Sequence, residues 1–170
     1  MSDDRVSLTK VHVRVPSNPR WEFQGGERLE SLWARPVGPG LYQIDNIPSA
    51  DHQLNYLDVV RVQEGVSGHG DALEVIGIHN RGGQTTFDLH FPELGFLALG
   101  KKRARKALLD TVRDDLNGNL ERFGDDWHGA SIPKERRRDA IELFGHAIQS
   151  EVLESFGTSG HGDRWSGRDW

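Results

Sequence analysis

The fold is decided by a stretch that runs from Leu29 to Ile47 and reads LESLWARPVGPGLYQIDNI. It holds two short apolar runs, at 29–35 and 41–47, and the segment between them is mostly Pro and Gly. Short apolar runs bounded by Gly and Pro are typical of strands joined by a tight turn. We therefore predict a pair of strands here and extend the sheet from them in both directions.

Strand-like segments lie on both sides of this pair. Valine alternates with polar residues over 11–15, and this period of two marks a half-buried strand. Further apolar runs follow at 57–63, 73–79 and 85–91, with glycine-containing segments between them. Short strands at this spacing predict an N-terminal antiparallel β sheet or small barrel, which we place at 8–92.

The apolar period changes to that of a helix after Gly100. One amphipathic helix runs up to Asn117-Gly118, and a second begins near Pro133 and keeps an apolar stripe as far as Phe156. Two short apolar runs between the helices predict a hairpin. The predicted fold class is therefore α+β, with the sheet or barrel packed against a C-terminal helix–hairpin–helix unit.

The two halves are expected to form one α+β domain at 1–157. Its β-rich lobe would span 8–92 and its helix–hairpin–helix lobe 101–157. Each lobe alone is at the margin of independent stability, which favours a shared body. Residues 158–170 are rich in Gly and hold no aliphatic residue, so we predict a flexible tail there.

Composition excludes several kinds of site. The chain of 170 residues has no Cys, so it can hold no disulfide, thiolate nucleophile or Cys-based zinc site. No run approaches the roughly 20 apolar residues that span a bilayer. The start of the chain is polar and acidic, unlike a secretory signal. We therefore expect a cytoplasmic protein without a membrane partner.

The net charge of −5 is spread unevenly along the sequence. Residues 1–100 hold 8 Lys and Arg against 13 Asp and Glu, whereas residues 101–170 hold 13 of each. An acidic β-rich half argues against nucleic acid as its partner and is compatible with a basic protein.

The chain also carries a family resemblance, which runs from about Val11 to Phe156 and includes Gly118-Asn119-Leu120-Glu121 and Ile132-Pro133. A Glu and a Trp lie on one apolar run, a Leu-Tyr pair opens the next, and Asn-x-Pro and Asp-Val-Val follow. This order resembles an uncharacterised bacterial family that is catalogued as a domain of unknown function. The resemblance implies an architecture rather than a reaction. The best matched residues are Glu30, Trp33, Asn46, Pro48, Asp58, His79 and Glu121.

A hydrolase or transferase is one alternative function. Glu30, Asp58 and His79 lie at or near strand ends, and two carboxylates with an imidazole could serve as general acid and base. In the simpler interpretation Asp58 caps a turn, Glu30 faces solvent and His79 ends a strand. The spacing along the chain leaves both interpretations open.

Two basic clusters, 101–106 and 134–138, each open a predicted helix. The helix dipole is positive there and disfavours cations, so such clusters can serve to bind an anion, a nucleic-acid backbone or an acidic protein face. Alternatively they are solvated helix ends, neutralised by acidic residues one turn away. No aromatic residues interleave with the basic ones, which argues against a nucleic-acid-associated module.

Residues 67–71 and 159–163 share the sequence SGHGD. His and Asp in both copies could bind a divalent metal, although glycine-rich turns draw on few residue types and the usual metal signatures are missing. We expect no metal and no cofactor.

The predicted function is that of a protein-binding protein, of the immunity or antitoxin type that inhibits a bacterial toxin. Small size, acidity and the lack of a catalytic motif support it. The contact residues are predicted to be Trp21, in a Pro- and Gly-rich loop, and the basic residues Arg136, Arg137 and Arg138. Trp33 is expected in the core. The identity of the partner and the oligomeric state stay open.

Overall fold

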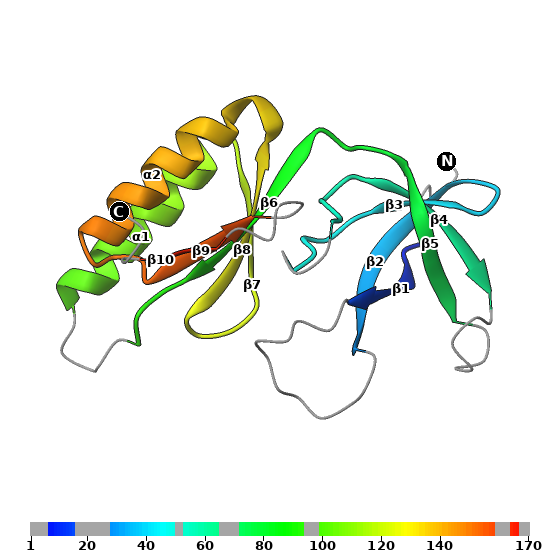
Figure 1. Cartoon of the computed structure of the whole chain (residues 1–170), viewed down its shortest axis with the longest axis horizontal. Coiled ribbons are helices and arrows are strands. Elements are labelled where there is room, and N and C mark those ends of the chain that lie inside the picture. Colours follow the sequence, from blue (N-terminus) through cyan, green and yellow to red (C-terminus); the bar gives the residue numbers. More distant parts are fainter. Residues whose placement is uncertain are drawn as a thin grey trace, which may run out of the picture. The chain divides into compact units, whose positions relative to one another are not determined.

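The computed structural model describes residues 7–15, 28–49, 53–64, 72–93, 99–158 and 164–166. The chain divides into two units (Figure 1). The first unit comprises Met1–Asn46 and Tyr56–Gly82, and the second comprises Ile47–Asn55 and Gly83–Trp170. A short segment that lies between two strands of the first unit therefore belongs to the second.

The first unit is a closed barrel of five strands in the order β1-β2-β3-β4-β5. Consecutive strands are antiparallel, and β1 pairs with β5 in parallel. The parallel closure follows from the odd number of strands, because the first and last strands of such a meander run in the same direction. The strands are β1 (Thr9–Val15), β2 (Arg28–Gly38), β3 (Leu41–Ile44), β4 (Val59–Glu64) and β5 (Leu73–Asn80).

Small aliphatic side chains fill the barrel. Val11 lies opposite Leu32, and Ala34 lies opposite Ile44, so successive strands present their apolar faces to one interior. These four side chains are fully buried. The turn between β2 and β3 contains Gly40 with a φ of +64°, a conformation that glycine adopts without strain. The paired strands predicted from the opening stretch are thus confirmed.

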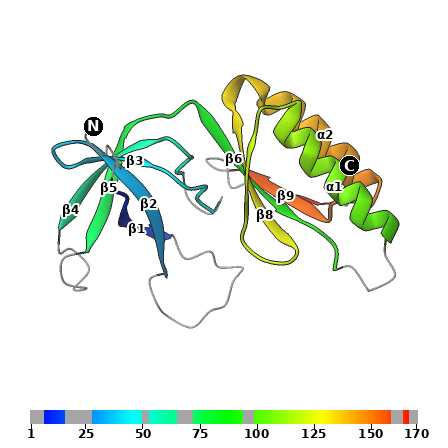
Figure 2. The same cartoon turned by 180° about the vertical axis from the view of Figure 1, so that it is seen from behind.

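The second unit contains a five-stranded antiparallel sheet in the order β10-β9-β6-β8-β7. Leaving out β10, the chain order is β-α-β-β-α-β, and β8 lies between β6 and β7. This is the split βαβ arrangement of ferredoxin-like folds. Both helices lie along one face of the sheet (Figures 1 and 2). The elements are β6 (Gln84–His90), α1 (Leu99–Asp114), β7 (Asn119–Arg122), β8 (Trp127–Pro133), a 3₁₀ turn (Lys134–Arg136), α2 (Arg137–Gln149), β9 (Ser155–Thr158) and β10 (Arg164–Ser166).

Three phenylalanine rings form the centre of the core between helices and sheet. The ring of Phe144 on α2 lies edge-on to Phe87 of β6, with centroids 5.2 Å apart, and 5.4 Å from the ring of Phe156 on β9. Leu108 and Val112 of α1 complete this core. Edge-on aromatic pairs add to the stabilisation that burial provides.

The other face of the sheet is polar but also buried. It presents Asp88 of β6 and Ser131 of β8, which are 8% and 0% exposed. The segment Ile47–Asn55 bonds to this sheet at both ends. The Ile47 N–H donates to Glu121 Oε2 over 2.9 Å, and the Asn55 side-chain oxygen accepts from the Thr86 N–H over 2.9 Å. Glu121, one of the residues that carry the family resemblance, therefore anchors the segment Ile47–Asn55 to β7.

Several sequence-based expectations are corrected here. The prediction of a separate helix–hairpin–helix unit is wrong, because the hairpin of β7 and β8 belongs to the same sheet as β6 and β9. The boundary expected between 92 and 101 lies instead between Gly82 and Gly83, since β6 belongs to the second unit. The tail prediction is wrong for Arg164–Ser166, which forms β10 and pairs with β9. The rest of 159–170 lies outside the described residues.

The end of α2 also differs from the prediction. The helix ends at Gln149, and Glu151 has a φ of +56°. The Val152 N–H then donates to the Ala147 carbonyl over 2.9 Å, and the Glu151 N–H to the Ile148 carbonyl over 3.0 Å. This pair of bonds is a Schellman cap, which turns the chain out of the helix toward β9.

The unequal charge of the two sequence halves is not a difference between the two units. The first unit holds 8 basic and 10 acidic residues, and the second holds 13 and 16. Three acidic residues of the N-terminal half, Asp51, Asp88 and Glu93, belong to the second unit. The expectation of an acidic β-rich lobe therefore loses its basis.

Within the part of the chain that the structure describes, no helix has the length and apolar character that crossing a membrane requires.

Candidate functional site

Asp58, one of the three residues of the alternative enzyme interpretation, is a buried structural anchor. Its side chain is fully buried just before β4, and it accepts hydrogen bonds from Arg81 Nη1 at 2.9 Å and the Gly82 N–H at 2.8 Å. A Cβ atom at Gly82 would lie 2.3 Å from the carbonyl carbon of Leu57, so only glycine fits this close approach. The carboxylate holds the end of β5 against the start of β4, as the turn-capping interpretation predicts.

Glu30 and His79 lie at different heights of the barrel. Glu30 of β2 is opposite Val13 of β1. Because β1 and β5 are parallel and His12 is opposite Glu74, Val13 is level with Val75 of β5. His79 is four residues further along β5, or about 13 Å along the strand. The structure therefore does not bring the three predicted groups together, and the carboxylate of Asp58 is shielded from any substrate.

The predicted basic contact residues at the start of α2 are largely neutralised by near neighbours. Arg136 Nε pairs with Asp139 Oδ2 at 3.0 Å, and its Nη2 donates to the Asp115 carbonyl at 3.2 Å. Arg138 Nε pairs with Glu142 Oε1 at 3.1 Å, and Arg137 is half-buried. Trp21 and both SGHGD segments lie outside the described residues.

The outward side of β1 and β2 is a stronger candidate. Val11 and Val13 point into the barrel, so the residues between them and beside them point out. Lys10 lies opposite Trp33, and its Nζ is 5.1 Å from the centre of the Trp33 ring. His12 lies opposite Ser31, with 3.1 Å between His12 Nδ1 and Ser31 Oγ.

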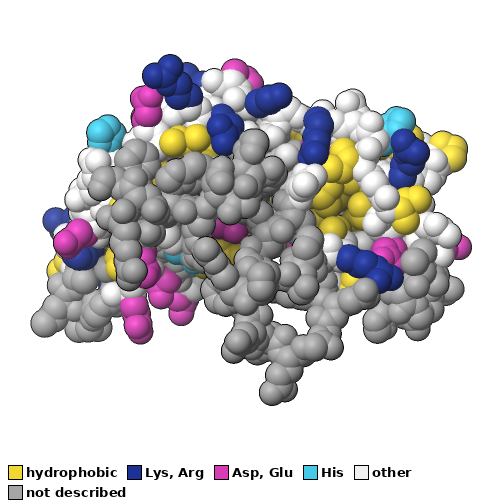
Figure 3. Space-filling view, in the orientation of Figure 1, with side chains coloured by type: hydrophobic (Ala, Val, Ile, Leu, Met, Phe, Trp, Pro, Cys, Tyr) yellow, Lys and Arg dark blue, Asp and Glu magenta, His cyan; other side chains and the backbone are white. Residues whose placement is uncertain are grey.

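Strand β5 extends this surface on the other side of β1. Glu74 is opposite His12 and forms an ion pair with Arg14. Ile76 is two residues further along the strand and 56% exposed, and Trp33 is 45% exposed. Figure 3 shows hydrophobic side chains beside Lys and Arg side chains on the visible side of the barrel. We call this surface the Trp33 face, and it consists of Lys10, His12, Arg14, Ser31, Trp33 and Ile76, with the buried carboxylate of Glu74 beneath Arg14.

The placement of Trp33 corrects the expectation of a core residue. Leu32 and Ala34 on either side of it are fully buried, so the pleat of β2 turns Trp33 outward. The sequence already indicated that Trp33 points outward. In a strand, neighbouring side chains point to opposite faces, so Trp33 lies on the face opposite to Leu32 and Ala34. The general habit of Trp to fill cores concealed it.

The Trp33 face is suited to contact rather than to chemistry. It combines a large exposed aromatic ring, an exposed branched aliphatic side chain and cations on rigid strands. Trp and Arg are the residue types that most often dominate binding energy at protein interfaces. Within the described parts of the chain, no cluster of His, Asp and Glu could hold a metal ion.

Comparison with known proteins supports the fold. A crystal structure described as that of a hypothetical protein from Neisseria gonorrhoeae matches 91% of this chain and 97% of its own, with a TM-score of 0.65 and 16% sequence identity. A match at this identity shows the fold alone. No protein-family model matches the sequence, and no curated protein matches it. The resemblance to a bacterial family of unknown function stays a prediction.

Proposed function

We propose that this chain acts by binding another protein in the cytoplasm, as an immunity-type inhibitor of a bacterial toxin, and that the Trp33 face is its contact surface. The observation that carries the proposal is the exposure of Trp33 on a strand whose neighbouring residues are fully buried. Trp is among the residue types that most often carry the binding energy of protein interfaces, and here it is held exposed on a rigid strand.

The rigidity of the barrel favours such a role. Trp33 and Ile76 are carried by strands of a closed barrel, so little backbone order has to be gained on binding. Lys10 over the Trp33 ring restricts the ring through a cation–π contact. Burial of one such aromatic anchor typically contributes 2 kcal/mol or more to binding, according to truncation experiments at interfaces.

Charge indicates the kind of protein surface that fits. Arg14 is already paired with Glu74, whereas Lys10 contacts no carboxylate within the described residues. The face therefore carries a surplus positive charge. An acidic patch on the partner complements it, which reverses the basic partner expected from the sequence halves.

The contact surface is tested by affinity measurement. The full chain is used as bait in a lysate of its source cell, and the recovered protein is purified and titrated by calorimetry. Trp33→Ala should raise Kd by about 30-fold, which corresponds to roughly 2 kcal/mol. Leu99→Ala is the matched control, since Leu99 is 65% exposed on the second unit. A folded Trp33→Ala variant that binds as tightly as the wild type contradicts the proposed surface.

The inhibitory role is tested separately by growth. The recovered partner is expressed alone and together with this chain. Arrest of growth by the partner, relieved by co-expression of the wild type but not of Trp33→Ala, is the expected result. A partner that binds but does not impair growth on its own contradicts the toxin inhibitor and leaves the binding surface standing.

A further inference from the structure

The second unit has an open pocket between α1 and the turn that joins β7 to β8, with a volume of about 640 Å³. Lys102, Arg105 and Lys106 line it from α1, where spacings of three and four place them on one side of the helix. Arg122 of β7 and His128 of β8 line it from the hairpin. A pocket of this size accommodates a small metabolite.

Arg105 is held in a fixed orientation in this pocket. Its side chain is 15% exposed, and its guanidinium lies 4.2 Å from the centre of the Phe91 ring. It pairs with Asp126 Oδ1 at 3.2 Å and also donates to the Asp125 carbonyl. A guanidinium fixed by stacking and by two acceptors keeps its charge in place without a ligand, which lowers the entropic cost of binding one.

His128 presents a neutral donor beside this charge. Its Nδ1 is 3.4 Å from Arg105 Nη2, and because a guanidinium only donates, Nδ1 accepts and the ring proton lies on Nε2. Burial, followed by the charges of Arg105 and Arg122, lowers the pKa of His128 below its ordinary 6.5, and the Asp126 carboxylate opposes this only in part. The cations around the ring thus outweigh the carboxylate.

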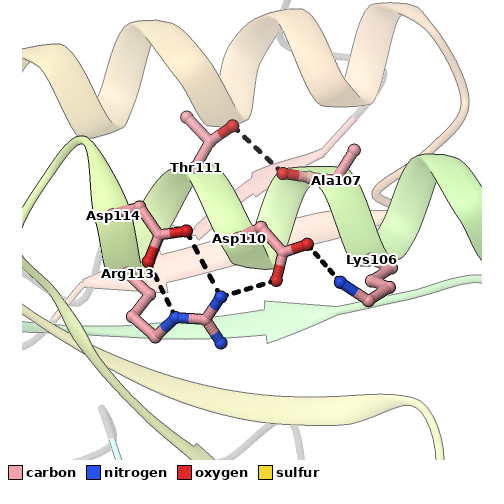
Figure 4. A network of polar contacts seen from close by, with 6 residues as sticks. All are labelled: Lys106, Ala107, Asp110, Thr111, Arg113 and Asp114. Atoms are coloured by element: carbon pink, nitrogen blue, oxygen red, sulfur yellow. Dashed lines mark hydrogen bonds and ion pairs between the residues drawn. The ribbon is translucent and has the colours of Figure 1, made fainter.

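The remaining charges of the lining leave one clear surplus cation. Arg122 pairs with Asp125, and Lys106 pairs with Asp110, which continues into the ion-pair network with Arg113 and Asp114 on the outside of α1 (Figure 4). Lys102 has no ion pair within the described residues. The lining as a whole has four cations against three carboxylates, Glu93, Asp125 and Asp126, with His128 neutral.

We propose that this pocket binds a small phosphate monoester. Lys102, Arg105 and Arg122 would hold the phosphate group, and His128 would donate through Nε2. Two guanidinium groups and an ammonium match a doubly charged oxyanion. The volume exceeds that of a phosphate, so the organic part of the ligand lies in the same pocket, where Leu109 offers it an apolar wall.

The test titrates the full chain with inorganic phosphate and, separately, with adenosine monophosphate, and follows the His128 ring by NMR. Phosphate should raise the pKa of His128, because a neighbouring anion favours the imidazolium. Adenosine monophosphate should bind at least about ten times more tightly than inorganic phosphate, since its organic part adds contacts. Equal affinities would contradict a site built for a monoester.

A matched pair of variants locates the site. Lys102→Gln should weaken binding of adenosine monophosphate by about tenfold, the effect of losing one charged contact of roughly 1.4 kcal/mol. Arg103→Gln removes the same charge from the adjacent, exposed residue, which does not line the pocket, and should change the affinity little. Equal losses in both variants would reduce the effect to net charge and overturn the proposal, as would an unchanged His128 pKa at about 20 mM phosphate.

Failure of this inference is distinguishable from failure of the proposed function. Trp33→Ala lies in the first unit and should leave phosphate binding unchanged, and Lys102→Gln should leave the Kd for the partner protein unchanged.

Discussion

The barrel and the second unit are stabilised in different ways. The barrel is filled by small aliphatic side chains such as Val11 and Ala34, and its strand ends are tied by the buried carboxylate of Asp58. The second unit places three phenylalanine rings between its helices and sheet. One unit thus depends on a polar anchor and the other on a large apolar core, and mutations can address each separately.

The largest expected effect is in the aromatic core. Phe144→Ala should destabilise the second unit by about 3–5 kcal/mol, because Phe144 is fully buried and its loss leaves a cavity beside Phe87 and Phe156. Denaturant unfolding followed by circular dichroism measures the loss. Hydrogen exchange should show that protection falls in β6, β9 and α2. A loss below about 1 kcal/mol would show that the rings do not form the core.

The polar anchor of the barrel should contribute less. Asp58→Asn keeps the size of the side chain but weakens two hydrogen bonds of an ionised acceptor, so we expect a loss of roughly 2–3 kcal/mol. Hydrogen exchange should localise the loss to β4 and β5. Where the variant is folded, the Kd for the partner protein should stay unchanged, whereas a catalytic Asp58 would abolish activity. Exchange that rises equally in the second unit would break the distinction between the two units.

The smallest effect concerns pH. The folded state holds the pKa of His128 below its ordinary 6.5, so the unfolded state binds the proton more readily. The contribution of this group to stability is therefore present above pH 6.5 and is lost as the pH falls through the folded pKa. His128→Gln should remove this contribution to the dependence of the free energy of unfolding on pH. Unfolding midpoints of wild type and variant that stay parallel from pH 7.5 to about 5 would contradict the lowered pKa.

The strands of the barrel could be predicted because alternation is a local property. The partners of a strand are not local, and this explains the misassignment of β6. Its run from Gln84 to His90 looks like the preceding strands, and only pairing with β8 and β9 shows that it belongs to another sheet. The parallel contact of β1 with β5 closes the barrel after five strands and leaves β6 no place in it.

The end of α2 was missed for a different reason. Val152, Leu153 and Phe156 continue the spacing of a helix face, although the chain leaves the helix at Ser150. The usual signal for such an end is a glycine in the left-handed conformation, and here Glu151 takes that conformation instead. Gly157, which follows the apolar stripe directly, lies in β9 and does not end a helix.

The candidate sites show the same limit. The basic residues at 101–106 and 134–138 look alike in sequence, and their neighbours decide their roles. Arg105 meets His128 and Phe91, more than ten residues away on either side, whereas Arg138 pairs with Glu142 one turn along its own helix. Charge clusters predict a possible contact, and the packing of distant segments decides whether a pocket forms.

The segment Ile47–Asn55 has a consequence for the modularity of this protein. It is inserted between two barrel strands, yet it belongs to the second unit and bonds at both ends to strands of that unit's sheet. A cut after Gly82 would therefore give an N-terminal fragment that contains the whole first unit and a C-terminal fragment that lacks residues 47–55 of the second unit. The C-terminal fragment would leave the Thr86 N–H and the Glu121 carboxylate without these two hydrogen-bond partners, Asn55 and Ile47. The two units cannot be exchanged by recombination at a single point, and any truncation study has to carry residues 47–55 along with the C-terminal part.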